Sequence, residues 1–403
     1  MAFWVREFVV FLILYRPGGI VIGAAILSVT AVIATAGTSA LVGRRREARA
    51  LVTEGLWLAL IFLLFCLADW ALLWALPHLK LSFSPVFAPL IASVSVRLLI
   101  FWGMLGAAML ARWRGRRRGM EVQTRLVAVT LFLIANLVFS GVQIDAYVVE
   151  PLLVETTELS LAFDDLDPTA LPVRVVHITD VHIERSSFRE AKVVQKVNAL
   201  QPDIIVLTGD YLNLSYLSDP TSAAHFRQFV AQLEASYGVY AVRGSVEPTL
   251  ESMAWLVEGT NVVWLEQEAV TVDVRGQPLT LVGVACSHQQ ELDTARLAQT
   301  MDGIPADAFT LLLYHSPDLV FEAAEHQVDL YLGGHTHGGQ LCLPFYGAIS
   351  TGSMYGKRYV SGLFEEGKTT MYISRGLGFE GGGTPRARFL CRPEIVNVEL
   401  RGQ

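Results

Sequence analysis

The sequence predicts two domains of different fold class: an α-helical transmembrane bundle in residues 1–150, followed by an α/β domain in residues 151–403. The first reason is composition, because 52% hydrophobic and 17% charged residues are too apolar a mixture for an ordinary soluble protein. The second reason is distribution. Up to Tyr147, long apolar runs are broken by arginine clusters, whereas after Pro151 short strand-like and helix-like segments alternate. A chain of 403 residues is long enough for both domains.

The apolar runs of the first part have the length of membrane-spanning helices. A helix needs about 20 apolar residues to cross a bilayer. Three runs reach that length, Gly18–Val42, Leu56–Leu76 and Pro89–Ala111, and a fourth, Leu126–Tyr147, reaches it with a few polar interruptions. The segment Met1–Tyr15 is shorter and lacks the basic start and cleavage site of a signal peptide, so we expect an interfacial helix there.

The distribution of basic residues predicts the orientation of this bundle. The loops after the first and third runs together carry ten arginines, whereas the opposite side carries only Arg6, Arg16 and Lys80. Positively charged loops stay in the cytoplasm. With four spans, everything after Tyr147 is therefore expected on the exoplasmic side. The ten arginines are Arg44, Arg45, Arg46, Arg49, Arg112, Arg114, Arg116, Arg117, Arg118 and Arg125.

Two charged residues interrupt the apolar runs, Asp69 in the second and Arg97 in the third. In antiparallel helices both would lie at a similar depth, and charges inside a bilayer are costly unless they are paired. We therefore predict that the two side chains contact each other. The alternative is that each reaches the outer interface or lines a polar cleft separately.

Net charge separates the two parts and excludes one class of partner. Residues 1–147 hold 14 basic and 6 acidic residues, a net charge of +8, and the remainder holds 17 basic and 32 acidic residues, a net charge of −15. So acidic a domain is a poor candidate for binding nucleic acid. Bound metal cations would let it attract an anionic substrate.

The four cysteines leave the redox state open. Cys66 lies within a predicted span, and Cys286, Cys342 and Cys391 lie in the second domain. One disulfide with a free thiol, or three buried small hydrophobic residues, are both compatible with this number.

Polar residues follow the predicted strands of the second domain at the points where these strands end. Near-continuous apolar runs indicate strands buried on both faces, and the helical spacing of Ser187–Leu200 between the first two gives a β-α-β pattern. Residues at the carboxyl ends of such strands converge on one edge of the sheet. The runs are "VRVVHITDVH" ending at Asp180 and His182, "PDIIVLTGD" at Gly209 and Asp210, "GVYAVRG" at Gly244, "FTLLLYH" at His315, and "VDLYLGGHTHGG" at His335 and His337.

These strand ends carry two aspartates and four histidines. Imidazole and carboxylate ligands together suit a borderline divalent metal such as Mn, Fe or Zn. Six such groups exceed the needs of one tetrahedral zinc and suit two metals that share a carboxylate. His288 also follows a predicted strand and is a weaker candidate, whereas His177, His225 and His326 are most simply structural or surface residues.

The order of these motifs resembles the calcineurin-like metallophosphoesterases from Val173 to Leu400. The extended "GGHTHGGQLCLPFYG" and the later "YISRGLG" are similar to the bacterial membrane-associated branch with YkuE-type phosphodiesterases, some relatives of which hydrolyse UDP-diacylglucosamine. The resemblance implies two β-sheets flanked by helices, and a metal-dependent phosphoric ester hydrolase that is a multi-pass protein of the bacterial inner membrane.

The resemblance also implies a role for each residue of the site. Asp180, His182 and His337 would hold the first metal, Asp210 would bridge both, and His315 and His335 would hold the second. Both cofactors would be divalent ions, with Mn first and Fe or Zn as alternatives. Catalytic roles fall to Asp210, His335 and Glu247, and substrate-binding roles to Gly338, Gly339 and His288.

The stretch "AVRGSVEP" departs from the family pattern. Ser245 and Val246 stand where the family has an Asn ligand to the second metal and a His that assists the leaving group. Because Val246 cannot donate a proton, we expect a pyrophosphate-linked or otherwise activated phosphoester to be preferred over an alkyl phosphodiester. The alternatives are a donor from elsewhere, His288 or Glu247, or a metal-binding sensory or binding protein without turnover. The membrane part is equally compatible with a lipid-linked substrate and with an anchor only.

Overall fold

The computed structural model describes residues 23–24, 45–83, 86–118, 125–247, 250–380 and 386–403. The predicted interfacial helix Met1–Tyr15 and, apart from residues 23–24, the predicted span Gly18–Val42 lie outside these residues. The chain divides into two compact units. The first comprises Met1–Asp145 with Gly383–Pro385, and the second comprises Ala146–Gly382 with Arg386–Gln403.

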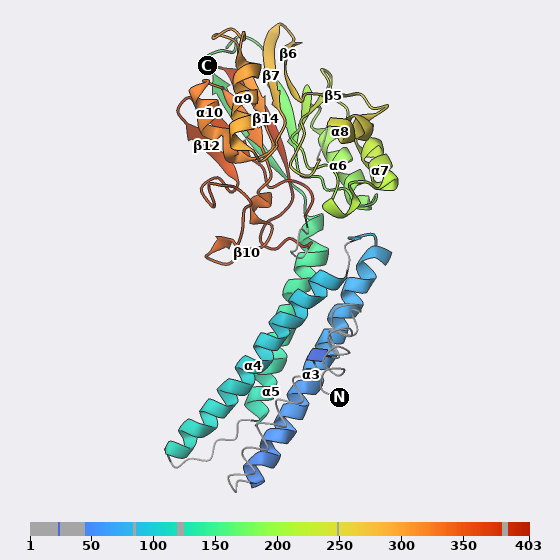
Figure 1. Ribbon diagram of the computed structural model, residues 1–403, viewed down its shortest axis with the longest axis vertical. Helices are drawn as coiled ribbons and strands as arrows, with labels where there is room; N and C mark the ends of the chain where they lie inside the picture. The colour runs from blue at the N-terminus through green and yellow to red at the C-terminus, as the bar shows by residue number, and fades with distance from the viewer. Residues whose placement is uncertain (1–22, 25–44, 84–85, 119–124, 248–249, 381–385) are drawn as a thin grey trace. The chain divides into compact units, whose positions relative to one another are not determined.

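Long apolar helices build the first unit (Figure 1). Among the described residues, three stretches are long and apolar enough to cross a membrane: Val52–His78, Phe87–Gly115 and Leu126–Leu152. They coincide with the second, third and fourth runs predicted from the sequence. The helices are α3 (Arg45–His78), α4 (Phe87–Arg117) and α5 (Arg125–Ile144), and two short helical segments follow, η1 (Asp145–Val149) and η2 (Glu150–Leu152).

The predicted contact between Asp69 and Arg97 is confirmed. Arg97 Nε lies 2.5 Å from Asp69 Oδ2, Arg97 Nη2 lies 2.6 Å from Asp69 Oδ1, and both side chains are buried. The guanidinium also donates to Asn136 Oδ1 at 2.8 Å, to Ser140 Oγ at 2.8 Å and to Gln143 Oε1 at 3.0 Å. Each of its three nitrogens therefore has an acceptor inside the helix bundle.

In its described residues, the second unit contains two six-stranded mixed sheets and a two-stranded hairpin. The first sheet has the order β1 (Glu155–Phe163), β14 (Glu394–Gly402), β2 (Val173–Ile178), β3 (Ile204–Leu207), β4 (Val239–Ala241) and β5 (Val262–Trp264). The second has the order β12 (Gly362–Glu366), β13 (Thr369–Ile373), β9 (Leu330–Gly333), β8 (Thr310–Leu313), β7 (Gln277–Val284) and β6 (Gln267–Val274). The hairpin pairs β10 (Cys342–Leu343) with β11 (Gly347–Ala348).

The two sheets pack face to face, with helices on their outer sides (Figure 1). One buried apolar cluster joins Val175 of β2 with Leu281 of β7 and Leu313 of β8, so it lies between the sheets. Separate clusters hold the helices against the outer faces of the two sheets. These helices are α6 (Phe188–Ala199), α7 (Pro220–Val230), α8 (Leu250–Val257), α9 (Gln290–Met301) and α10 (Val320–Glu325). The predicted sandwich of two sheets flanked by helices is confirmed.

The central strands β2, β3 and β4 run parallel, as do β7, β8 and β9. Strands β3 and β8 are buried along their whole length, which explains their continuous apolar sequences. The predicted helix between β2 and β3 is α6. Its N-cap Ser187 and Glu190 form a reciprocal capping box, which fixes the first turn. The carboxyl ends of the parallel strands therefore lie at one edge of the domain.

Candidate metal centre

The six predicted ligands follow the strand ends, and most have an unusual backbone conformation. Asp180, His182, Asp210, His335 and His337 have φ between 46° and 71°, a left-handed region that few non-glycine residues adopt. Such backbone strain persists where the surrounding structure enforces it, and it concentrates at functional sites. Directly after a strand, this conformation turns the chain sharply, and it recurs at both sheets.

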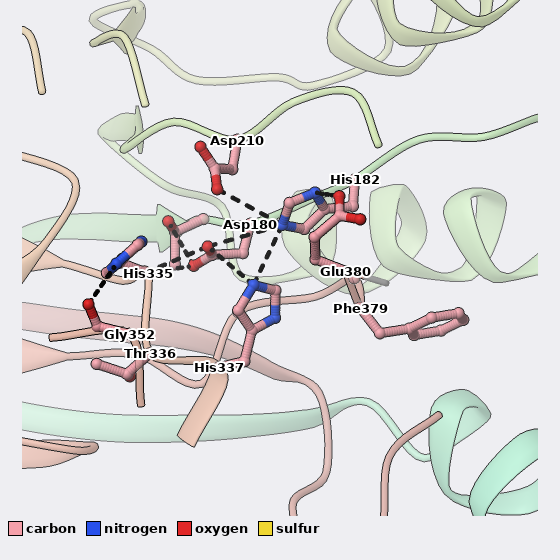
Figure 2. A network of polar contacts seen from close by, with 12 residues as sticks. Asp180, His182, Asp210, His335, Thr336, His337, Gly352, Phe379 and Glu380 are labelled. Carbon is pink, nitrogen blue, oxygen red and sulfur yellow. Dashed lines mark hydrogen bonds and ion pairs between the residues drawn. The ribbon is translucent and has the colours of Figure 1, made fainter. Parts of the chain in front are cut away.

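The first group consists of Asp180, His182 and His337, all buried (Figure 2). The Nε2 atoms of the two histidines are 3.1 Å apart, and His337 Nε2 lies 3.4 Å from Asp180 Oδ1. Burial lowers the pKa of His337 to about 3, so its imidazole is neutral at pH 7, the form that binds metals. Two imidazole nitrogens and a carboxylate oxygen thus face a common point, which fits a divalent cation.

The second group consists of Asp210, His315 and His335. His315 Nε2 lies 3.2 Å from Asp210 Oδ2 and 3.2 Å from His335 Nδ1. On its other side, His315 Nδ1 donates to the Thr208 carbonyl at 2.7 Å, which fixes the tautomer and leaves Nε2 as a ligand atom. Burial, together with the charge of His315, lowers the pKa of His335 to about 4.

Asp210 faces both groups. Its Oδ2 lies 3.2 Å from His315 Nε2 and 3.7 Å from His182 Nε2, the latter a residue of the first group. Burial opposes protonation of His315, but the charge of Asp210 raises the pKa of His315 well above its usual value. The carboxylates therefore favour positive charge in the centre, as a pair of cations sharing Asp210 would supply.

The "AVRGSVEP" loop supplies backbone amides to this centre. The amides of Ser245 and Val246 donate to Asp210 Oδ1 at 2.7 Å and 3.0 Å, which leaves Oδ2 directed at the histidines. Ser245 Oγ lies 3.1 Å from Asp210 Oδ2 and 3.4 Å from His315 Nε2, so the serine stands at the second group. The Val246 side chain is buried and offers no polar atom.

Glu247 lies behind the Asp210 turn. Its buried carboxylate accepts hydrogen bonds from the amides of Asp210 at 3.2 Å, Gly244 at 3.0 Å and Tyr211 at 2.7 Å. Burial, and then the charge of Asp210, raise the pKa of Glu247 to about 7. These contacts are those of a group that holds the turn in place, and a catalytic role for Glu247 stays a prediction.

The predicted substrate-binding residues occupy two different environments. His288 is exposed, and its ring centre lies 5.0 Å from that of His335. Gly338 and Gly339 are buried, and their amides donate to Thr336. A Cβ atom on Gly339 would come within 2.2 Å of Ala348 Cβ, so close packing requires this glycine. Substrate binding by these three residues stays a prediction.

The remaining histidines lie outside the two groups. His177 is buried in β2, with Nε2 2.7 Å from Thr208 Oγ1. His225 Nδ1 accepts from the Ser186 amide at 3.0 Å, and His326 caps α10. These placements match the structural roles expected from the sequence.

Glu380 is not among the residues predicted from the sequence, but it contacts the first group. Its Oε2 lies 3.2 Å from His182 Nδ1, on the side of the ring opposite the other ligands (Figure 2). The Gln340 amide holds the Glu380 backbone at both its N–H and its carbonyl, each at 2.9 Å. A carboxylate on the outer nitrogen of a histidine orients the ring and raises its basicity. Glu380 lies two residues after the quoted "YISRGLG", but no local sequence pattern predicts the contact.

Arg388 was also missed. Its guanidinium is fully buried and donates to the carbonyls of Arg375 at 2.7 Å, Gly376 at 3.1 Å and Gly378 at 2.9 Å. A Cβ atom on Gly376 would lie 2.6 Å from Asp180 Cβ, so this turn presses against the first group. Arg388 therefore stabilises, by hydrogen bonds, the turn that packs on Asp180.

Comparisons with known proteins agree with this geometry. Residues 173–339 match the family of calcineurin-like phosphoesterases. The uncharacterized metallophosphoesterase YkuE of Bacillus subtilis is 29% identical over 266 residues, 62% of this chain and 87% of YkuE. A transmembrane protein with metallophosphoesterase domain from Bos taurus is 28% identical over 333 residues, 75% of this chain and 70% of that protein. The UDP-2,3-diacylglucosamine pyrophosphatase LpxG of Chlamydia trachomatis is 25% identical over 300 residues, 61% of this chain and 89% of LpxG.

The predicted family and enzyme class are thereby confirmed. The second unit carries a calcineurin-like phosphoesterase domain, and the chain is a metallophosphoesterase with two His/Asp groups that can hold metals.

Proposed function

We propose that this membrane-anchored calcineurin-like phosphoesterase hydrolyses phosphoesters whose leaving group departs as a stable anion, with a pyrophosphate linkage preferred. The observation that carries the proposal is a complete set of six ligand residues beside a loop whose side chains offer no strong proton donor. The first feature supports turnover, and the second restricts the substrate.

The six residues would together coordinate two divalent cations, and we expect these to be Mn. Asp180, His182 and His337 would hold one cation, His315 and His335 would hold the other, and Asp210 would be shared between them. When bound, such cations would supply an activated water and neutralise charge on the phosphoryl oxygens. The Ser245 and Val246 amides orient the Asp210 carboxylate, and Glu247 fixes the turn behind it.

This chain differs from the family pattern at the residue that would protonate the leaving group of the substrate. Positioned acid catalysis typically contributes about 10²–10⁴-fold, and an alkoxide depends on it far more than a phosphate anion does. The Val246 side chain cannot donate a proton, and both oxygens of Glu247 are bonded to backbone amides. The exposed His288 beside His335 is the remaining candidate donor. The similarity to a pyrophosphatase of Chlamydia trachomatis supports a pyrophosphate linkage.

The sequence of the membrane part supports a location for the phosphoesterase domain. The arginine-rich loops support cytoplasmic ends for the helix pairs and hence an exoplasmic phosphoesterase domain. We place the border between the two domains near residue 150, where the last apolar stretch ends at Leu152 and β1 begins at Glu155. The net charge of −15 argues against nucleic acid as a substrate.

The test compares leaving groups on the purified full chain. The double variant Ser245→Asn with Val246→His restores the family's side chains, and it should raise hydrolysis of an alkyl phosphodiester by at least about tenfold more than hydrolysis of a pyrophosphate diester. The unaltered protein should cleave the pyrophosphate and an aryl phosphodiester and hold two metal ions per chain. Equal gains on both substrates would contradict the leaving-group argument. One ion without hydrolysis of any phosphoester would favour a binding or sensory protein.

A further inference from the structure

A cluster of exposed apolar side chains lies on the hairpin that follows the metal ligand His337. We call residues 342–349 the apolar hairpin; it includes β10 and β11. Leu343, Tyr346 and Ile349 are each about half exposed or more, and Phe345 is completely exposed. Elsewhere on the described part of this domain, exposed large apolar residues occur mostly singly, such as Leu171 and Leu292. A cluster of this kind marks an interaction surface.

The base of the apolar hairpin is hydrogen-bonded to the segment around Phe389. The Phe389 amide donates to the Gln340 carbonyl at 3.0 Å, and the Cys342 amide donates to the Phe389 carbonyl at 2.9 Å. The next residue in that segment, Leu390, is also exposed. The hairpin and this segment therefore form one continuous edge of the domain.

The same segment is bonded to η1 and η2, the short helical segments that begin the second unit. The Arg388 amide donates to the Ala146 carbonyl at 2.9 Å, the Leu390 amide donates to Glu150 Oε2 at 2.7 Å, and the Cys391 amide donates to the other oxygen of Glu150. Ala146 and Glu150 belong to the stretch Leu126–Leu152, which is long and apolar enough to cross a membrane. Two successive sets of hydrogen bonds thus connect the apolar hairpin to the last residues of this apolar stretch.

The apolar hairpin is also next to the metal centre. It begins five residues after His337, and Ala348 packs against Gly339 of the ligand turn. Just beyond the hairpin, the Gly352 carbonyl lies 3.4 Å from His335 Nε2 (Figure 2). A molecule bound at the hairpin would therefore have its neighbouring groups close to the second metal group.

A basic residue borders the apolar hairpin. Lys357 is exposed, and its Nζ lies 3.3 Å from the centre of the Tyr346 ring. Aromatic and aliphatic side chains beside lysine and arginine are typical of surfaces that enter the lipid headgroup region, where the apolar part meets acyl chains and the cations meet phosphates. Because the domain as a whole is strongly acidic, a cation held against the hairpin at this edge supports that role.

We propose that the apolar hairpin inserts into the interface of the bilayer that this chain's own helices cross, and that it presents the metal centre to phosphoesters carried by lipids of that bilayer. The substrate class rests on the proposed function, whereas the insertion itself does not. Insertion would let a lipid headgroup reach the centre while its acyl chains stay in the membrane.

The insertion is tested on the full chain in nanodiscs of phosphatidylethanolamine and phosphatidylglycerol. The photoreactive residue p-benzoylphenylalanine replaces Phe345 in one preparation and Leu171 in a control. Leu171 is exposed beside the turn between β6 and β7, at the end of the domain opposite β10 (Figure 1). We expect phospholipid adducts at position 345 and at least tenfold fewer at position 171. Equal yields, or a cross-link to a second copy of the chain, would overturn the proposal.

The consequence for the substrate is tested with the double variant Phe345→Ser with Tyr346→Ser and the control Leu171→Ser. The double variant should cleave CDP-diacylglycerol in the nanodisc at least roughly tenfold more slowly, since two apolar side chains no longer enter the interface. Its cleavage of water-soluble bis(p-nitrophenyl) phosphate should change less than twofold. Equal loss on both substrates would overturn the presentation of lipids. Failure of the unaltered protein on both substrates would overturn the proposed function, and the cross-link would still decide the insertion.

Discussion

Two of the buried polar clusters in the described residues, one in each unit, differ in how their nitrogen atoms are hydrogen-bonded. In the helix bundle, each nitrogen of Arg97 donates to an acceptor from Asp69, Asn136, Ser140 or Gln143. In the phosphoesterase domain, ligand nitrogens face one another, and His182 Nε2 and His337 Nε2 are only 3.1 Å apart. A closed network of hydrogen bonds fixes a structure, whereas histidine nitrogens and carboxylate oxygens that converge on one point suit a bound cation. The comparison separates a structural cluster from a ligand site.

Removal of Asp210 should have the largest effect, because both metal groups depend on it. We expect Asp210→Ala to abolish phosphoester hydrolysis and to deplete both metal ions together, as measured by elemental analysis of the purified protein. The control Asp273→Asn changes an exposed carboxylate of β6. A variant that kept either ion at full occupancy would show that Asp210 is not shared.

Loss of one partner of the buried Asp69–Arg97 pair should destabilise the helix bundle, whereas loss of both partners should cost much less stability. Arg97→Leu leaves Asp69 buried without its cation and should destabilise the helix bundle by about 3–5 kcal/mol. The double variant with Asp69→Leu should recover most of that loss. Thermal unfolding in detergent measures both, and metal content should stay unchanged. A double variant no more stable than the single one would contradict this account.

The orientation of His182 should depend on Glu380. We expect Glu380→Gln to weaken the first metal by about 10–100-fold and to leave the second unchanged, because the amide supplies no charge to His182 Nδ1. Competition with a chelator of known affinity measures each ion, with a variant of the exposed Glu365, Glu365→Gln, as the control. An equal loss of both ions would indicate a general distortion of the centre.

The smallest effect is expected at Ser245. Its hydroxyl contacts Asp210 at 3.1 Å, but the Ser245 and Val246 amides hold the same carboxylate without it. Ser245→Ala should therefore weaken the second metal by less than roughly tenfold. The same chelator titration measures it. A loss as large as that of Asp210→Ala would make the serine hydroxyl a required ligand.

The fold class, the six candidate metal ligands and the Asp69–Arg97 pair could all be predicted from the sequence alone. Each of these rests on a local signal: apolar length for a span, an apolar run for a buried strand, and a polar residue within a few positions of the strand end. Parallel strands carry such residues to one edge without any further information, and the cost of a buried charge makes its partner predictable.

The contacts between segments far apart in the sequence could not be predicted and became visible in the tertiary structure. Glu380 meets His182 across 198 residues, and Glu150 meets Leu390 across 240. Glu247 turns out to hold three backbone amides, and the apolar hairpin stays exposed although its composition suits a core. Irregular segments make these contacts, and they have no periodicity to predict which side chain points where. Their positions follow from the packing of two sheets built from distant strands.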